Sequence, residues 1–409
     1  MRRRNTPTST VKAATLDRVH VGSRTVVVLG PVRLPDPDFV RDRLCALADL
    51  GPTARLGLRP DSQRRHWLHD PESIADAVSV EAAPDDPGSL LSGSGSSEPF
   101  CMTLAGDHLR TEHDHGLGEV QLALLSHLLV IGDADPADPA LRAQIGANGD
   151  IVRAALRTFA TDPRRIPAVL TQTRAVRWPD AEDDGIYPAR GPVGPAAAQT
   201  SVLTREKIAA LRRWRSDRAL DASMMTLVMC GFSNALAAHG VVLDQSITVT
   251  VDLRRYLPAG ANPLNNVVSS VCLPYPRRSD PATVHRQLAA AVKSGRPLAA
   301  AVRSVATIRA REMLGRWRPV AADGPVRAHL TFAGVHELPQ FSRFDWIDPE
   351  AGGCLVRSDP GDPAGILLDA IGICGGIWLS ASHHPTVIPT AQVEAAISGF
   401  AADPISYLN

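Results

Sequence analysis

The interpretation of this sequence rests on one short stretch, Glu112-His113-Asp114-His115-Gly116-Leu117-Gly118. It follows an apolar, strand-like segment at residues 100–104 and precedes a leucine-rich run at residues 120–130, in which leucines recur at helical spacing. Two histidines, an aspartate and two glycines are an unusual concentration for a surface loop. The pattern indicates that one histidine is placed for acid–base chemistry, because an unperturbed histidine changes its charge near neutral pH.

Composition argues against several classes of protein. The chain has 409 residues, of which 44% are hydrophobic and 21% charged, enough to bury the cores of two domains or of one large body. Its 43 Lys and Arg residues balance its 43 Asp and Glu residues, which argues against nucleic acid or an anionic membrane as the main partner. No apolar run of about 18 residues occurs, and no apolar signal core follows the basic start. We therefore expect a soluble, cytoplasmic protein.

Expected strands and helices are mixed along the whole chain. A segment rich in proline, glycine and acidic residues, at residues 179–200, is the clearest linker. It divides the sequence into an N-terminal lobe at residues 1–178, which carries the histidine motif, and a C-terminal lobe at residues 201–409. The expected strands are residues 25–29, 100–104, 246–253, 267–273, 327–332, 365–370 and 376–380, and the main expected helices are residues 39–48, 120–130, 204–211, 221–239, 285–315 and 390–401.

The motif and its surroundings resemble the chloramphenicol-acetyltransferase-like superfamily, which includes condensation domains of nonribosomal peptide synthetases and stand-alone acyltransferases. The hallmark of that family is HHxxxDG, two histidines and an Asp-Gly pair, on a loop between a strand and a helix. Here His113 falls at the second histidine and Gly118 at the glycine. Leu124 and Leu125 follow where the family usually has a leucine pair, whereas a register with Gly116 at the glycine leaves no histidine at the catalytic position.

Weaker similarities lie in the second half of the chain. Residues 249–256 and the following Asn265-Asn266 are similar to a family strand that ends in Asp-Leu-Arg and to an asparagine before the next strand. The resemblance implies an α/β protein of two similar lobes that form a V, with a tunnel between them. It also implies a structural role for Asp252 and Arg254, and a substrate contact for Asn266 near the tunnel.

The motif departs from the family pattern at two positions. Glu112 stands in place of the first histidine, and Leu117 stands in place of the aspartate. In the family that aspartate is mainly structural and is commonly paired with an arginine that holds the loop. Leu117 has no carboxylate for such an ion pair, and Asp114 is a candidate to replace it in part.

The resemblance implies acyl transfer with His113 as general base. The neutral imidazole would take a proton from an alcohol or amine, which then attacks the carbonyl of an acyl thioester, and such assistance is worth roughly 10²–10⁴-fold in rate. The thioester would be carried by coenzyme A or by a phosphopantetheinyl carrier protein, and no metal or redox cofactor is required. His115 is a candidate to hydrogen-bond His113 or to line the substrate path. His113 and His115 also have the spacing of metal ligands on a strand, but no third ligand is suitably spaced.

Two other functions fit the same sequence. The loss of the motif aspartate fits a scaffold that catalyses a different reaction, such as cyclisation, dehydration or rearrangement of a biosynthetic intermediate. It also fits a non-catalytic module that binds a carrier protein. The sequence identifies neither the donor nor the acceptor.

Overall fold

The computed structural model describes residues 9–93, 95–147, 149–175, 185–189, 193–275, 280–314, 325–335 and 338–409. The chain forms two compact units, and each is discontinuous in sequence. The first unit comprises residues 1–150, 257–267 and 339–356. The second comprises residues 151–256, 268–338 and 357–409.

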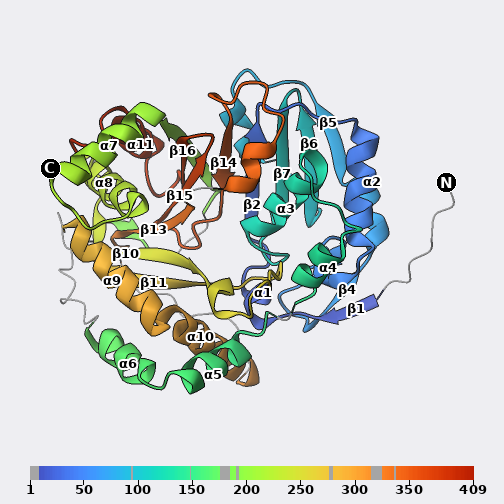
Figure 1. The fold of residues 1–409 in the computed structure, drawn as a ribbon, viewed down its shortest axis with the longest axis horizontal. Helices are drawn as coiled ribbons and strands as arrows, with labels where there is room; N and C mark the ends of the chain where they lie inside the picture. The colour runs from blue at the N-terminus through green and yellow to red at the C-terminus, as the bar shows by residue number, and fades with distance from the viewer. Residues whose placement is uncertain are drawn as a thin grey trace. The chain divides into compact units, whose positions relative to one another are not determined.

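The first unit is built on a five-stranded sheet with the order β14-β2-β7-β6-β5 (Figure 1). β6 and β7 form an antiparallel pair that brings Phe100 opposite His113, and β2 pairs with the other side of β7, with Thr25 opposite His113. The strands are β2 (Arg24–Gly30), β5 (Val78–Glu81), β6 (Phe100–Ala105), β7 (His108–Asp114) and β14 (Gly353–Arg357).

Two helices of the first unit, α2 (Pro37–Ala48) and α3 (Val120–Ile131), bury leucines in the same core as alternate residues of β6 and β7. α2 begins at Pro37, two residues before the expected start, because the Asp36 side chain accepts a hydrogen bond from the Asp38 amide and Pro37 occupies the first turn. The remaining elements are α1 (Thr15–Val19), α4 (Pro139–Ile145) and a small sheet of β1 (Ser9–Lys12), β4 (His66–His69) and β3 (Leu58–Arg59).

The second unit is built on a six-stranded sheet with the order β11-β10-β13-β15-β16-β9. β13 is parallel to both β10 and β15, and the other neighbours are antiparallel. The strands are β9 (Ala197–Leu203), β10 (Leu243–Asp252), β11 (Val268–Pro274), β13 (Ala328–Val335), β15 (Gly365–Ile373) and β16 (Gly376–His383).

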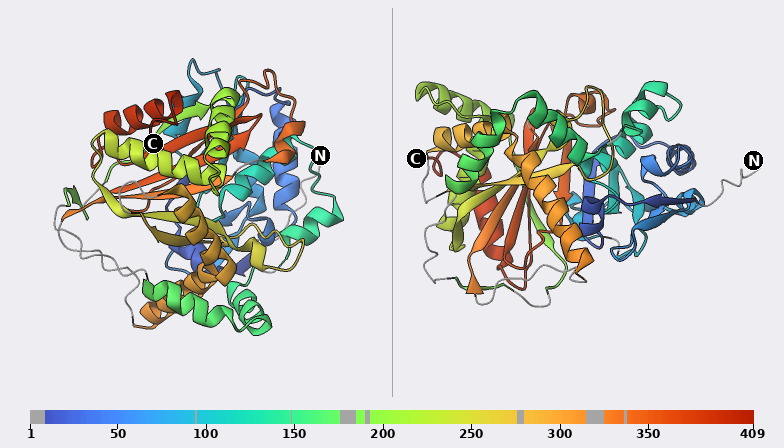
Figure 2. Two further views of the ribbon diagram at one scale, coloured as in Figure 1. Left: turned by 60° about the vertical axis from the view of Figure 1, so that its left-hand side comes forward. Right: turned by 90° about the horizontal axis from the view of Figure 1, so that it is seen from below.

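One face of this sheet forms the largest core of the protein. Alternate residues such as Leu330, Leu368 and Leu379 pack against helices that Figure 2 shows from two directions. The helices of the unit are α5 (Ile151–Thr161), α6 (Arg165–Ala175), α7 (Arg205–Asp217), α8 (Met224–Ala238), α9 (Pro281–Ser294), α10 (Arg296–Met313) and α11 (Thr390–Ala402). β8 (Tyr187–Pro188) and β12 (Pro325–Val326) form a further two-stranded sheet.

Most expected elements lie where the pattern places them, but the strands β5 and β14 and the helix α6 were not expected. Three further points differ. A second strand, β7, lies between the strand at residues 100–104 and the turn, so that His113 and Asp114 end a strand. The helix expected at residues 285–315 is two helices, because Gly295 at φ +82° ends α9 in the left-handed conformation. Within the expected linker, residues 179–184 and 190–192 lie outside the described residues, and Ala197 begins strand β9. In the described part of the chain, no helix is both long and apolar enough to cross a lipid bilayer.

Candidate active site

His113 lies in the penultimate position of β7 and is fully buried, with 0% of its surface exposed. Side chains alternate along a strand, so His113 points to the same face of the sheet as Thr111. Thr111 hydrogen-bonds His127 of α3, with 2.9 Å between Oγ1 and Nε2, which identifies this as the face that α3 covers. The sheet and α3 together therefore fix the direction of the His113 ring.

One hydrogen bond decides which nitrogen of His113 carries the proton. Nε2 lies 3.2 Å from the carbonyl oxygen of Gly118, and a carbonyl can only accept. The proton is therefore on Nε2, and the lone pair is on Nδ1, which is buried and has no hydrogen-bond partner among the described residues. Burial, and then the nearby His115, lower the pKa of His113 to about 3. The ring is neutral at physiological pH and can accept a proton at Nδ1.

The backbone of Gly118, which supplies that carbonyl, lies very close to another backbone segment. A Cβ atom at Gly118 would lie 2.3 Å from the carbonyl oxygen of Leu264, far inside contact distance. The glycine is therefore required for the close approach of two backbones and not for an unusual φ angle.

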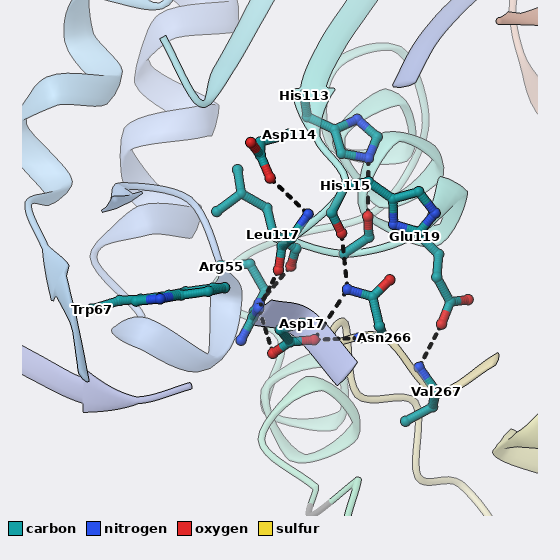
Figure 3. A network of polar contacts seen from close by, with 12 residues as sticks. Asp17, Arg55, Trp67, His113, Asp114, His115, Leu117, Glu119, Asn266 and Val267 are labelled. Atoms are coloured by element: carbon teal, nitrogen blue, oxygen red, sulfur yellow. Dashed lines mark hydrogen bonds and ion pairs between the residues drawn. The ribbon is translucent and has the colours of Figure 1, made fainter. Parts of the chain in front are cut away.

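Leu117 is also fully buried and belongs to the core of the first unit, so the side chain at the family's aspartate position makes apolar contacts. An arginine nevertheless holds this loop by its backbone (Figure 3). Arg55 donates from Nε to the carbonyl of Leu117 at 2.5 Å, and from a terminal nitrogen to the carbonyl of Gly116 at 2.9 Å. The guanidinium also lies over the ring of Trp67, at 5.7 Å from its centroid.

The carboxylate that pairs with this arginine comes from Asp17 of α1. Asp17 is fully buried, and its Oδ2 lies 2.8 Å from the Arg55 guanidinium. Its Oδ1 accepts from the backbone and side-chain nitrogens of Asn266, at 2.9 and 3.1 Å. The Asn266 side chain also donates to the carbonyl of His115 at 2.8 Å. Asp17 thus provides from a distant segment the ion pair that Leu117 cannot make.

A second carboxylate joins the same two segments. Glu119, directly after the motif, accepts from the backbone amide of Val267 at 2.6 Å. Four buried side chains join residues 115–119 to residues 264–267. They are Asp17, Arg55, Glu119 and Asn266. We call these four residues the loop clamp.

Asp114 and Glu112 have other partners. The two carboxylate oxygens of Asp114 accept from the backbone amides of Gly22 and Gly116, at 2.9 and 2.7 Å. Glu112, at the position of the first family histidine, forms an ion pair with Arg24 at 3.0 Å. Asp114 therefore shapes the turn, and the arginine that holds the loop is paired with Asp17 instead.

His115 stacks on His20, with 4.4 Å between ring centroids and 17° between the ring planes. Burial, together with the positive charge that His115 would carry, lowers the pKa of His20 to about 3, and burial also lowers the pKa of His115. Two rings that repel each other when protonated are stable side by side only as neutral imidazoles. In the described part of the chain, the His113 and His115 side chains form no hydrogen bond with each other.

The predicted site residues fall into two groups. His113, His115, Gly118 and Asn266 lie together in the first unit, although Asn266 is only 1% exposed and its amide nitrogen is engaged by Asp17 and His115. Its predicted substrate contact stays a prediction.

Asp252 and Arg254 lie in the second unit. They form a local pair, in which Asp252 Oδ1 accepts from the Arg254 backbone amide at 2.8 Å and from its guanidinium at 3.2 Å. The structural role that the resemblance implies for the two residues stays a prediction.

Sequence reasoning missed Asp17 and Arg55, because neither lies in a motif and their contact joins positions 38 residues apart. No signal in the sequence around Arg55 indicates its role, and its left-handed φ of +71° is visible only in the structure. Within the described ranges, no group of three or more His, Cys, Asp or Glu side chains is placed to hold a metal ion.

No protein-family model matches the sequence, and no curated protein sequence matches it. Solved structures do match. Polyketide synthase associated protein 5 from Mycobacterium tuberculosis superposes with a TM-score of 0.59 and 13% identity, over 98% of this chain and 100% of that one. The starter condensation domain of rhizomide synthetase gives 0.55 and 13%, over 97% and 93%.

The chain has the fold of the condensation domains. Trichothecene 15-O-acetyltransferase from Fusarium sporotrichioides shares this fold too, with a TM-score of 0.56 and 8% identity over 98% of this chain and 95% of that one. The resemblance to chloramphenicol-acetyltransferase-like proteins is therefore confirmed at the level of the α/β fold. At these identities, the neighbours establish the fold and not the reaction.

Proposed function

We propose that this protein transfers an acyl group from a thioester to an alcohol or amine, with His113 as the general base. The observation that carries the proposal is the His113 ring itself. It is neutral, its Nε2–H is held by Gly118, and its Nδ1 has a lone pair with no partner among the described residues. A neutral ring with an unpartnered lone pair can take a proton from a nucleophile.

The fold neighbours support the choice of donor and acceptor. One neighbour is a 15-O-acetyltransferase, and a condensation-domain structure is a complex with C8-CoA and Leu-SNAC, which are thioesters. We propose coenzyme A or a phosphopantetheinyl carrier protein as the carrier of the acyl group, and natural-product or lipid biosynthesis as the setting. The substrate contacts of His115 and Asn266 belong to this proposal.

The test is a panel of acyl-CoA and acyl-SNAC thioesters with alcohol and amine acceptors, followed by mass analysis of the products. His113→Ala should lower turnover by roughly 10²–10⁴-fold. His127→Ala is the matched control, because His127 is equally buried, has a pKa also lowered to about 3, and bonds Thr111 rather than the motif loop. It should keep turnover within about threefold. Circular dichroism of both variants would verify the fold, and equal turnover of wild type and His113→Ala would refute the assignment.

The complete burial of His113 favours a second candidate, a non-catalytic module that binds a carrier protein. A substrate hydroxyl must reach Nδ1 for catalysis, and the residue has no exposed surface in this structure. Binding of a phosphopantetheinylated carrier protein, with no turnover of any thioester in the panel, would support this candidate over acyl transfer. Turnover of a thioester to a different product, such as a cyclised or dehydrated one, would support a changed reaction on the same scaffold.

A further inference from the structure

Asp369 lies in the middle of β15, on the face of the second sheet opposite to the main core. Its neighbours along the strand, Leu368 and Ala370, are fully buried in that core. Because side chains alternate along a strand, Asp369 points the other way. The register places it between Ala333 of β13 and Ser380 of β16, and Ser380 is opposite Thr200 of β9. A carboxyl group and two hydroxyl groups thus form one row across three strands.

This carboxyl group has no counter-charge. Its Oδ2 is buried and has no hydrogen-bond partner, and no ion pair of Asp369 occurs among the described residues. Burial raises the pKa of Asp369 to about 8. The residue as a whole is nevertheless partly accessible, as is the small Ala333 beside it. The carboxyl group is therefore desolvated but lies on a face that a ligand can approach.

Among the described residues, no other titratable group on this face forms an ion pair with Asp369. His329 lies at the start of β13, beside Asp362 at 3.5 Å. Asp252 is at the end of β10, paired with Arg254, and β10 is two strands from β15. Cys272 lies on β11, at the edge of the sheet. None of the residues opposite Asp369 on β13 and β16 is titratable.

The flanking side chains favour an organic cation. Trp378, two residues before Ser380 on β16, points to the same face, opposite Ile371. Leu367 lies on the other side of Asp369 along β15. Diagonal neighbours across two strands are within reach of an aromatic side chain. A substituted ammonium group fits these surroundings better than an inorganic ion does. Its charge can contact the carboxylate and the hydroxyl groups, while its substituent contacts the indole ring and the aliphatic side chains.

We propose that Asp369, with Ser380 and Thr200 beside it, binds the ammonium group of an organic amine. The ammonium would donate to Oδ2, which lacks a partner, and would supply the missing positive charge. A cation stabilises the ionised form of this carboxyl group, whereas an anion or an uncharged alcohol forms no ion pair with it. This site does not depend on the proposed acyl transfer, since an amine can bind there whether or not the protein turns over a thioester.

Binding of an ammonium should release a proton at pH 7. In the unliganded protein the carboxyl group is largely protonated, and the bound cation stabilises its ionised form, so the proton passes to the buffer. Calorimetric titration with n-butylammonium at pH 7, in phosphate and in cacodylate, measures the number of protons released from the difference in apparent enthalpy, and neither buffer is an amine. n-Butanol serves as the uncharged analogue of nearly equal size.

Asp369→Asn keeps the size of the side chain and removes the charge. It should weaken n-butylammonium binding by at least tenfold and abolish proton release. Asp362→Asn, in the exposed turn before β15, is the control and should bind as the wild type does. Equal affinity of wild type and Asp369→Asn would overturn the proposal, as would equal affinity for n-butanol and n-butylammonium, or no binding at 50 mM. These measurements need no turnover, so they are independent of the test of His113.

Discussion

At the scale of single residues, the state of His113 sets the pH dependence of any reaction it catalyses. A base with an ordinary histidine pKa would lose activity below about pH 6.5. With a pKa of about 3, His113 stays neutral down to about pH 4. We expect kcat/KM to show no acid limb near pH 6.5, although a weaker base gives less assistance at every pH. A profile between pH 4.5 and 8 measures this, and a limb at pH 6–7 that disappears in His113→Ala would contradict it.

The buried Asp17–Arg55 pair is the second feature at this scale. Removal of one partner leaves the other charge buried without compensation, which costs about 3–5 kcal/mol. Arg55→Met should therefore lower the free energy of unfolding by about that amount in urea titrations. Arg33→Met is the control, because Arg33 lies the same 2.8 Å from Asp345 but both side chains are mostly exposed. We expect a change there of only about 0–1 kcal/mol, and equal losses in the two variants would show that the clamp contributes nothing specific.

At the scale of elements, local pattern predicted the strands and helices, but contacts distant in sequence were invisible. The leucine spacing of residues 120–130 identified α3, and alternation identified β10, because both signals are local. The strand β7 was not predicted as one, since His108, Arg110, Glu112 and Asp114 do not resemble a buried strand. Their partners explain the burial: Arg24 pairs with Glu112, and the amides of Gly22 and Gly116 donate to Asp114. A polar residue whose partner lies about 90 positions away carries no signal in its own segment.

The turn between β7 and α3 gives a prediction at this scale. Gly118→Ala would place a methyl group 2.3 Å from the Leu264 carbonyl, so one of the two backbone segments must move. We expect a loss of about 1–3 kcal/mol in stability and displacement of the carbonyl that holds His113. Gly194→Ala is the control, because its nearest neighbour would lie at 3.7 Å and no left-handed φ is involved. A crystal structure or the His113 imidazole NMR signals of Gly118→Ala would show whether the ring has turned, and an unchanged ring with unchanged stability would contradict the close-approach argument.

At the scale of the whole molecule, buried titratable groups set how stability varies with pH. His20, His113 and His127 each have a pKa of about 3, against 6.5 when unfolded. Between these values the unfolded chain binds the extra protons, so stability falls as pH decreases from about 6.5 to 3. Asp369 acts in the opposite direction. Its pKa is about 8 in the fold against 3.8 when unfolded, so the folded chain binds the extra proton and stability falls as pH rises from about 4 to 8.

These opposing effects predict a maximum of stability near pH 6.5. Between about pH 4 and 6 the unfolded state binds three more protons than the folded state at the histidines, and the folded state binds one more at Asp369. The unfolded state therefore binds more protons in total, and stability rises with pH over this range. Above about pH 7.5 the histidines are largely neutral in both states and only the decline from Asp369 remains. Asp369→Asn should therefore remove the decline toward pH 8 and make the rise with pH on the acid side steeper, because Asp369 no longer opposes the histidines there. Urea unfolding of wild type and Asp369→Asn at half-unit steps from pH 4.5 to 8.5 measures both limbs, and parallel curves for the two proteins above pH 6.5 would show that Asp369 is ionised in the fold without penalty.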